Sequence, residues 1–576
     1  MARYAVSWWD VVLYVGLAVF SWYMYRILVK PLLSPLRKIP GTPYVPFFGN
    51  MLEARRYEAM TNCIRWMTKL DSKIIRFYFF GGEERVLVAD PDIFQHVLIT
   101  NSKNYDRVGD LSRGPLGKLL PNPLFVLSGE HHHIVRKICN PGFSIRLIHG
   151  MVPTFQERAE ALIHLWTQGL QTQDNKMFGD VNAQTDLAKL TSDVICKCGF
   201  GYDMHTIENP DSPLVQPLQR LNANSPTSFL DLLPFSRWYP TKRNRQVWED
   251  SKLIFQLADK ILHQKKQTLG TKDCGQDLLT SLLVARDQEG GAMSDKDLFG
   301  EVIGFFFAGF ETSDVICKCG FGYDMHTIEN PDSPLVQPLQ RLNANSPTSF
   351  LDLLPFSRWY PTKRNRQVWE DSKLIFQLAD KILHQKKQTL GTKDCGQDLL
   401  TSLLVARDQE GGAMSDKDLF GEVIGFFFAG FELKYLTCVI KETLRLFPPI
   451  VTLFRTAKKD DTLKGYHIPA GTKIGLHNGA LHRLNWEDPD SFKPERFMEH
   501  IDNESRKFLP FGIGPYMCIG YKFSFMEMKT VLACLIHEFD FKLSPGYSYK
   551  RQQSLVLKPF PRARLRVTKI SGQASE

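Results

Sequence analysis

The pattern of hydrophobic positions changes along the chain. An uncharged apolar run covers residues 11–25 and extends to Val6 if Asp10 is tolerated near an interface, which is marginal to adequate for a helix that spans a bilayer. β-Branched and aromatic stretches predict short strands at 74–80, 85–88, 473–476 and 539–543, the first two joined as a hairpin. Elsewhere apolar residues recur mostly at helical spacing, so the pattern predicts a mainly α protein with a small β portion.

The flanks of the apolar run indicate a retained transmembrane anchor at residues 6–28. Aromatic residues lie at both ends, as in the belts at membrane surfaces: Trp8, Trp9, Trp22, Tyr23 and Tyr25. Basic residues are denser after the run than before it, which places the bulk of the chain in the cytosol. A cleaved signal peptide is the alternative, but the segment has neither a basic start nor a clear small-x-small cleavage site.

Prolines separate the anchor from the remainder of the chain. They stand at positions 31, 35, 40, 43 and 46. Proline restricts its own backbone and that of the residue before it, so residues 29–50 are expected to form a stiff, non-helical hinge. A single catalytic domain is then expected over 51–570, and a disordered tail over 571–576.

Composition narrows the class of protein. With 43% hydrophobic and 12% aromatic residues among 576, the chain can bury a large core. The 71 basic and 62 acidic residues give a net charge of +9, which favours anionic lipid or acidic partners. This charge is diffuse, without the Lys/Arg blocks typical of nucleic-acid binding. Eleven cysteines in so long a chain indicate reduced intracellular thiols rather than a disulfide framework.

An internal repeat occupies the middle of the chain. Residues 191–311 recur without a difference as residues 312–432. Solenoid repeats are shorter, at about 20–50 residues, so the identity indicates a recent tandem duplication, an assembly error or an engineered insertion. We expect the first copy to pack in the core and 312–432 to form an insert.

A glycine-rich loop near the end of the chain presents one cysteine. Residues 511–520 contain Cys518 and lead into an amphipathic helical pattern over 521–535. Free amides and the dipole at a helix start favour a thiolate, and a thiolate held among backbone N–H groups is a good axial ligand for haem iron. The alternative is a structural cysteine buried beneath the loop.

The spacing of this loop resembles the haem-binding signature of the cytochrome P-450 family, membrane-anchored microsomal type. The matching residues are Phe511, Gly514, Cys518 and Gly520. The resemblance implies the cytochrome P-450 fold, haem b with Cys518 as the metal ligand, and O₂ as co-substrate. Residues 40–50 are similar to the proline hinge of the same family.

Other segments resemble the parts of this family that hold the haem propionates. Residues 129–143 resemble the C-helix, with His132 at the Trp position and Arg136 at the Arg position. Arg455 and His482 stand where the family often donates to propionates, and Tyr516 replaces the usual Arg or His two residues before the ligand. An exposed histidine cluster on a helix is the alternative for residues 131–133.

A third resemblance concerns the distal side of the haem. Four residues at the end of the first copy and just after it resemble the distal-helix motif, in which a small residue leaves room for O₂ and an acid and an alcohol steer protons: Ala308, Gly309, Glu311 and Thr312. The second copy ends at Glu432 and continues with Leu433, so it lacks the threonine.

The K-helix and its meander arginine are matched by three residues that are expected to form a buried ionic network: Glu442, Arg445 and Arg496. Only nine residues separate Glu432 from Glu442, whereas the family places its J-helix region there. The chain therefore resembles a family member with that region missing.

These resemblances imply a haem-thiolate monooxygenase in the endoplasmic reticulum membrane, single-pass, with its catalytic domain in the cytosol. The expected electron donor is an NADPH-dependent cytochrome P-450 reductase that docks near Arg136, Lys137 and Lys522, with cytochrome b5 as a second candidate. Phe305, Phe306 and Phe307 suggest a lipophilic substrate such as a fatty acid, sterol or xenobiotic. An inactive or isomerase-like haem protein, and a non-functional product of a rearranged gene, are the alternatives.

Overall fold

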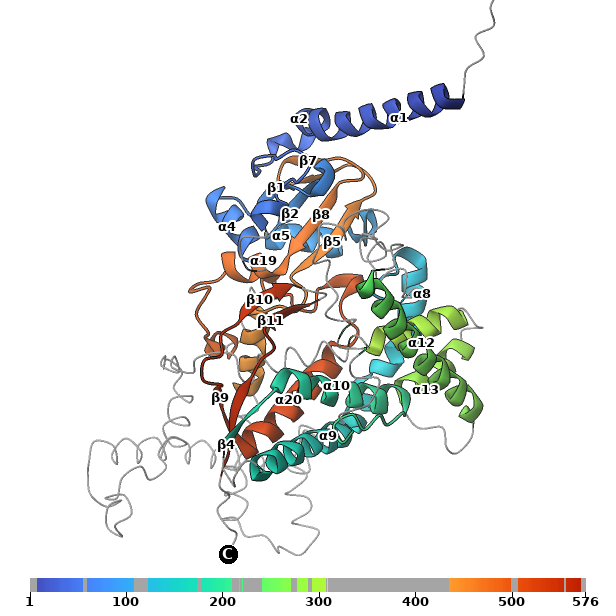
Figure 1. Cartoon of the computed structure of the whole chain (residues 1–576), viewed down its shortest axis with the longest axis vertical. Helices are drawn as coiled ribbons and strands as arrows, with labels where there is room; N and C mark the ends of the chain where they lie inside the picture. Colours follow the sequence, from blue (N-terminus) through green and yellow to red (C-terminus); the bar gives the residue numbers. More distant parts are fainter. Residues whose placement is uncertain are drawn as a thin grey trace, which may run out of the picture. The chain divides into compact units, whose positions relative to one another are not determined.

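The computed structural model is mainly helical with small sheets, as the sequence pattern predicts (Figure 1). It describes residues 8–54, 58, 60–107, 123–172, 178–209, 217, 220, 241–270, 277–288, 293–306, 308, 435–498, 506–553 and 556–570. The second copy and the tail lie outside this range, so the predictions made for them stay predictions.

The helices and strands of the described residues come in runs along the chain. The α-helices are α1 (Trp8–Met24), α2 (Lys30–Leu33), α3 (Met51–Ala54), α4 (Thr61–Lys69), α5 (Pro91–Gln95), α8 (Gly129–Cys139), α9 (Ile145–Thr172), α10 (Ala183–Phe200), α12 (Lys242–Thr268), α13 (Leu278–Gln288), 295–306, 435–446, α19 (Asn478–Leu484) and α20 (Tyr521–Glu538). The strands are β1 (Ile74–Tyr78), β2 (Glu84–Val88), β3 (Tyr105–Arg107), β4 (Phe178–Val181), β5 (Thr452–Ala457), β6 (Asp461–Leu463), β7 (Tyr466–Ile468), β8 (Lys473–His477), β9 (Phe539–Leu543), β10 (Lys550–Gln553), β11 (Leu557–Phe560) and β12 (Leu565–Lys569).

The largest sheet joins two distant parts of the sequence. Its strand order is β1-β2-β8-β5-β3. β1 and β2 form the predicted antiparallel hairpin, with Ile74 opposite Val88. β2 also pairs in parallel with β8, with Val88 opposite Leu476. In Figure 1 the blue strands of the first hundred residues therefore lie beside the orange strands of residues 452–477.

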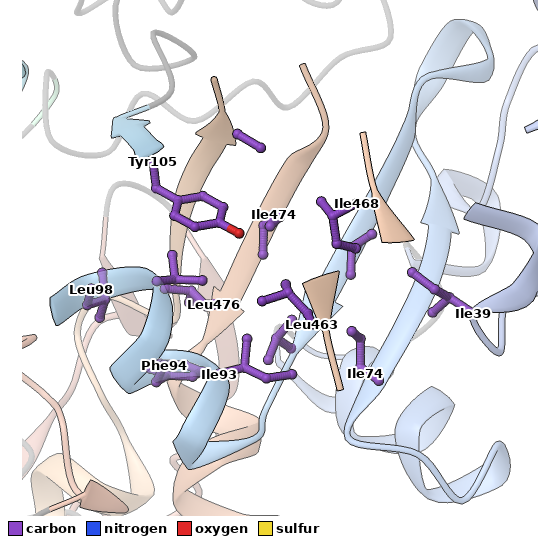
Figure 2. Close-up of a cluster of buried hydrophobic side chains, with 14 of the residues drawn as sticks. Ile39, Ile74, Ile93, Phe94, Leu98, Tyr105, Leu463, Ile468, Ile474 and Leu476 are labelled. Carbon is purple, nitrogen blue, oxygen red and sulfur yellow. The ribbon is translucent and has the colours of Figure 1, made fainter. Parts of the chain in front are cut away.

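A buried hydrophobic cluster stabilises this sheet. Figure 2 shows side chains from α5 and from strands of both parts converging on one another, including Ile93, Phe94, Ile474 and Leu476. Each of these four is at most 2% exposed. Full burial of such a side chain contributes about 1.5–3 kcal/mol, so the cluster fixes the pairing of the two segments.

The segment after the anchor is part of the fold, and the prediction that residues 29–50 are non-helical is wrong for 30–33 and 35–38. That 29–50 acts as a hinge stays a prediction. Residues 30–33 are helical, and Leu36 and Ile39 are buried in the hydrophobic cluster. Tyr44 Oη donates a hydrogen bond to the carbonyl of Ile27 at 2.6 Å, and Asn50 Oδ1 accepts one from the backbone of β1. The prolines shape the path of this segment without detaching it from the core.

The N-terminal apolar run forms a helix, as expected. Within the described residues one helical stretch, Val11–Leu33, is long and apolar enough to cross a membrane, and nearly all of it is exposed. A π-helical turn, Tyr25–Val29, interrupts it. Ile27 in that turn is fully buried, so the helix end is packed against protein while the rest of the run stays exposed.

Two helices position the loop that carries the candidate ligand. α20 begins immediately after that loop and packs along α9, where the rings of Phe155 and Phe523 meet edge to face at 5.2 Å between centroids. The predicted helix over 521–535 is therefore confirmed. Because α20 is buried along one face, the residues at its N-terminus are held in a fixed place.

Candidate active site

The loop around Cys518 has a backbone that requires glycine. Gly514 has φ of +74°, and a Cβ there would lie 2.2 Å from the carbonyl oxygen of Leu98. The Cys518 amide donates to the carbonyl of Phe511 at 2.9 Å, which closes the loop. Cys518 is exposed and stands three residues before the first residue of α20. It is therefore presented outward at a helix start, and the alternative of a buried structural cysteine is wrong.

α8 lies against this loop. Arg136 Nη1 donates to the carbonyl of Met517 at 2.6 Å, and its Nε donates to Asn140 at 3.0 Å. His132 is 3% exposed, and its ring lies 4.4 Å from that of Tyr516. The alternative of an exposed histidine cluster is therefore wrong for His132, although the residues on either side of it are exposed.

Tyr516 is the centre of a cationic cluster. The guanidinium of Arg107 lies 4.5 Å from the centroid of its ring, and that of Arg455 lies 5.4 Å away. Arg107 also donates to the Tyr516 carbonyl at 3.3 Å, and the Tyr516 hydroxyl accepts the amide N–H of Gly129 at 3.2 Å. Cation–π contacts of this kind stabilise positive charge where a carboxylate is missing.

The cluster lacks anions of its own. Burial, with repulsion from neighbouring arginines, lowers the pKa of Arg107 to about 9, and burial lowers that of Arg455 to about 10. Burial also lowers the pKa of Arg136 and reduces that of His132 to about 3, so the imidazole is neutral at pH 7. Among the described residues these guanidiniums form no ion pair with a carboxylate, and the Tyr516 phenol and the thiols of Cys518 and Cys139 favour their charged forms.

His482 has a different role from the expected one. Its Nδ1 lies 3.2 Å from the Arg445 carbonyl, and its Nε2 accepts the amide N–H of Leu509 at 2.9 Å. Both ring nitrogens of this fully buried side chain are therefore occupied by backbone. The expectation that His482 donates to a propionate is wrong, because no ring N–H is left for it; His482 instead ties the start of the cysteine loop to α19.

The helix at 435–446 carries the expected ion pair. Arg445 binds the Glu442 carboxylate through Nε at 2.8 Å and Nη2 at 2.9 Å, and both side chains are fully buried. Arg445 also donates to three backbone carbonyls, those of His482, Pro489 and Ser491. The Glu442–Arg445 part of the network is thus present, and the membership of Arg496 stays a prediction.

The distal motif is only partly within the described residues. Ala308 is described and exposed, while Gly309, Glu311 and Thr312 lie outside that range. Thr312 is also the first residue of the second copy, and its counterpart Thr191 is a buried residue of α10. The threonine that completes the motif is therefore supplied by the junction of the two copies.

The phenylalanines before this motif pack inward. Phe305 meets Phe143 edge to face at 5.5 Å, and Phe306 meets Phe200 at 4.9 Å. Both are at most 6% exposed. Gly309 lies outside the described residues, so the expectation that these rings partly line an approach to it stays a prediction. Phe307 lies outside the residues whose side chains are described. Phe125, which is 37% exposed and lies 3.5 Å from a Cβ built at Gly304, offers an aromatic surface beside this helix.

Comparison with known proteins agrees with this geometry. A family model described as cytochrome P-450 matches residues 39–314, 312–432 and 431–567. This chain belongs to the cytochrome P-450 family. The middle match coincides with the second copy, so the repeated segment is itself cytochrome P-450 sequence.

Its relatives include cytochromes P-450 from plants and a fungus. The chain is 23% identical to "Cytochrome P-450 72A13" of Arabidopsis thaliana, over 95% of this chain and 96% of the relative. It is 25% identical to "Cytochrome P-450 monooxygenase 128" of Postia placenta, over 96% and 95%. It is also 25% identical to "Secologanin synthase 1" of Catharanthus roseus, over 84% and 79%. The enzyme class is accordingly that of the cytochrome P-450 monooxygenases, which are oxidoreductases.

The residues of this cytochrome P-450 fit a haem. The cluster of cations without carboxylate ion pairs would accept two propionates, and the buried Nε2 of His132 has no hydrogen-bond partner among the described residues. Cys518 lies on the same loop as Tyr516. Arg107 also belongs to this cluster, although no sequence motif predicts it. It lies 409 positions from Tyr516 and reaches the site through the pairing of β3 with β5.

Proposed function

We propose that this chain binds haem b through Cys518 and inserts one oxygen atom of O₂ into a lipophilic substrate. The observation that carries the proposal is the cluster of guanidiniums without carboxylate partners around Tyr516, two residues from the cysteine. A buried cluster of like charges is costly unless an anion compensates it. A dianionic cofactor whose metal takes a thiolate meets both requirements at once.

The protein residues then have separate tasks. When bound, haem supplies O₂ activation, and a thiolate ligand favours O–O cleavage. Cys518 would hold the iron, and Arg107, Arg136, Arg455 and His132 would hold the propionates. Phe511, whose ring lies 5.5 Å from that of Phe525, would cover the thiolate side, and Gly514 lets the loop approach the Leu98 carbonyl closely. Gly520 lies beside the ring of Phe143. Ala308 and Gly309 would leave room for O₂, and Glu311 and Thr312 would deliver protons.

A lipophilic substrate is favoured by the N-terminal helix. A membrane concentrates apolar compounds, and a catalytic unit fastened to a spanning helix meets them at the surface. The exposed ring of Phe125 beside the helix at 295–306 supplies apolar area of the kind found in substrate pockets. The proposed location is the endoplasmic reticulum membrane, with the catalytic domain in the cytosol.

The proposed electron donor is an acidic NADPH-dependent flavoprotein reductase, with cytochrome b5 as a second donor. Arg136 of α8 donates a hydrogen bond to the cysteine loop, and Lys522 is the second residue of α20. Together with Lys137 of α8, they make the surface near Cys518 basic. Docking through such charges weakens as salt rises, with a screening length of about 8–10 Å at 0.10–0.15 M. Reductase-supported turnover that ignores ionic strength would contradict this docking site.

The test of the function is the carbon monoxide difference spectrum of the reduced protein in membranes. The wild type should give the red-shifted Soret band of a thiolate ligand, C518S should lose it, and C534S, a half-buried cysteine of α20, should keep it. Absence of the band in the wild type would favour a non-functional product. Haem incorporated without NADPH-dependent oxygen insertion would favour an inactive or isomerase-like haem protein.

A further inference from the structure

A buried carboxyl group has no role in the function proposed so far. Glu301 lies in the helix at 295–306 and is 1% exposed. Within the described part of the chain it forms a hydrogen bond but no ion pair: its Oε1 accepts the amide N–H of Leu124 at 2.5 Å. The helix begins with a capping box, in which Ser294 and Asp297 exchange hydrogen bonds. This cap fixes the start of the helix, and Glu301 follows one turn after Asp297.

The Leu124 backbone connects this carboxyl group to the cationic cluster. Its carbonyl accepts a hydrogen bond from Arg107 Nη1 at 2.7 Å, and Arg107 Nη2 donates to the carbonyl of Tyr516 at 3.3 Å. A continuous series of hydrogen bonds therefore runs from Glu301 through Leu124 and Arg107 to the cysteine loop.

Two further contacts hold the same segment, residues 123–131, on the same helix. A Cβ built at Gly304 would lie 3.2 Å from Cβ of Pro123, so only a small residue allows this close approach. His131 Nε2 lies 3.3 Å from Asp297 Oδ1, one turn before Glu301. The ionisable groups that face Glu301 are Asp297 on its own helix, Arg107 on β3 and Cys139 on α8.

We propose that Glu301 is a positioning residue that fastens residues 123–131 to the helix at 295–306. In this way Glu301 holds Arg107 against Tyr516, where Arg107 meets the anionic edge of the cofactor. The second half of this statement rests on the proposed function; the first half does not. The hydrogen bond requires an acceptor oxygen at the position of Oε1, not a charge, so glutamine can replace Glu301 and aspartate, one methylene shorter, cannot.

The experiment compares E301Q, E301D and E301L in the full-length protein by hydrogen exchange of a peptide covering 123–131 and by the rate at which haem passes to an apoglobin acceptor. E301D should exchange at least threefold and E301L at least tenfold faster than the wild type, and both should release haem faster. E301Q should be no faster than the wild type on either measurement. The matched control is E422L, the same change at the same local sequence in the second copy, which should leave both rates unchanged.

The outcomes separate the two parts of the proposal. Wild-type exchange in E301D and E301L, or a change in E422L instead, would overturn the fastening role of Glu301. Faster exchange without faster haem release would overturn the presentation of Arg107. A wild-type protein that holds no haem would contradict the proposed function. The exchange rates of the variants would then still show whether Glu301 fastens residues 123–131.

Discussion

Tyr516 shows how a single position redistributes charge within a site. The resemblance predicts a cation two residues before the ligand, and the chain has a phenol there. Two guanidiniums and an imidazole gather around its ring instead. An aromatic face attracts each cation by about 0.5–2 kcal/mol, so the ring lets them lie close together without a carboxylate. The positive charge is thus supplied from β3 and β5 rather than from the loop itself.

The first prediction at this scale concerns Glu301 and pH. Burial, with repulsion from Asp297, raises the pKa of Glu301 to about 8 in the folded protein, from 4.5 in the unfolded chain. Above pH 4.5 the unfolded chain releases this proton while the folded chain keeps it, so stability falls as pH rises from 4.5 to 8 and is flat beyond. At pH 7 the loss is roughly 3 kcal/mol. E301Q should therefore raise the melting temperature at pH 7–9 and leave it unchanged at pH 4. A difference that does not vary with pH would contradict this account.

The second prediction uses two glycines of the cysteine loop. Gly512 and Gly514 both have positive φ, at +70° and +74°. A Cβ at Gly512 meets only Leu453 at 3.9 Å, whereas one at Gly514 collides with the Leu98 carbonyl. G512A should cost about 1–2 kcal/mol from backbone strain alone, and G514A clearly more, with loss of the thiolate spectrum. Thermal unfolding and the carbon monoxide spectrum check the pair; equal effects would show that the collision is relieved.

At the scale of elements, the sequence predicts what is local. The β1–β2 hairpin, the strands β8 and β9 and the helix α20 follow from periodicity and from glycine breaks, because both depend on neighbouring residues. The parallel pairing of β2 with β8 cannot be predicted in this way, because neither strand has a sequence feature that indicates a partner far along the chain. Such distant contacts also explain the burial of Leu36 and Ile39, the position of Arg107 in the site and the backbone hydrogen bonds of His482. Local sequence patterns do not predict these features.

The third prediction concerns the helix at 435–446. Arg445 is fully buried and binds Glu442 and three carbonyls. R445A would leave the Glu442 carboxylate without its partner, at a cost of about 3–5 kcal/mol. The exposed pair of Arg566 with Asp180 is the control, and R566A should cost no more than about 1 kcal/mol. Chemical unfolding of both variants measures the difference, and comparable losses would contradict the structural role of Arg445.

At the scale of the whole molecule, the described residues of the site lie in 26–170, 293–308 and 440–543, outside the second copy. Thr312, proposed to deliver protons, is the first residue of that copy. Deleting either copy yields the same polypeptide, because the copies are identical. That chain would join Ala308 to Tyr435 through residues 309–311, 433 and 434, which reach about 20 Å at most. In the family the distal helix and the K-helix lie on opposite faces of the haem. A connection this short should therefore prevent the site from assembling.

The fourth prediction follows from this connection. A chain in which a Gly/Ser linker of about 40 residues replaces 313–432 spans roughly 35 Å on average and should keep the thiolate spectrum, whereas the direct deletion should lose it. The spectra of the two chains in membranes, at equal haem loading, make the comparison. Loss of the band with the linker as well would mean that the second copy contributes side chains to the core.

The sheet that combines β2 with β8 cannot form until both strands have been synthesised. On the ribosome, β2 emerges long before its partner, because about 390 residues separate Val88 from Ile474, and at roughly 5–20 residues per second the delay is about 20–80 s. Of that delay, the second copy accounts for about 6–24 s. Throughout it, one half of the cluster in Figure 2 has no second half to bury it. The nascent chain therefore depends on chaperones for longer than that of a relative without the repeat, and its yield in cells should respond to the rate of elongation.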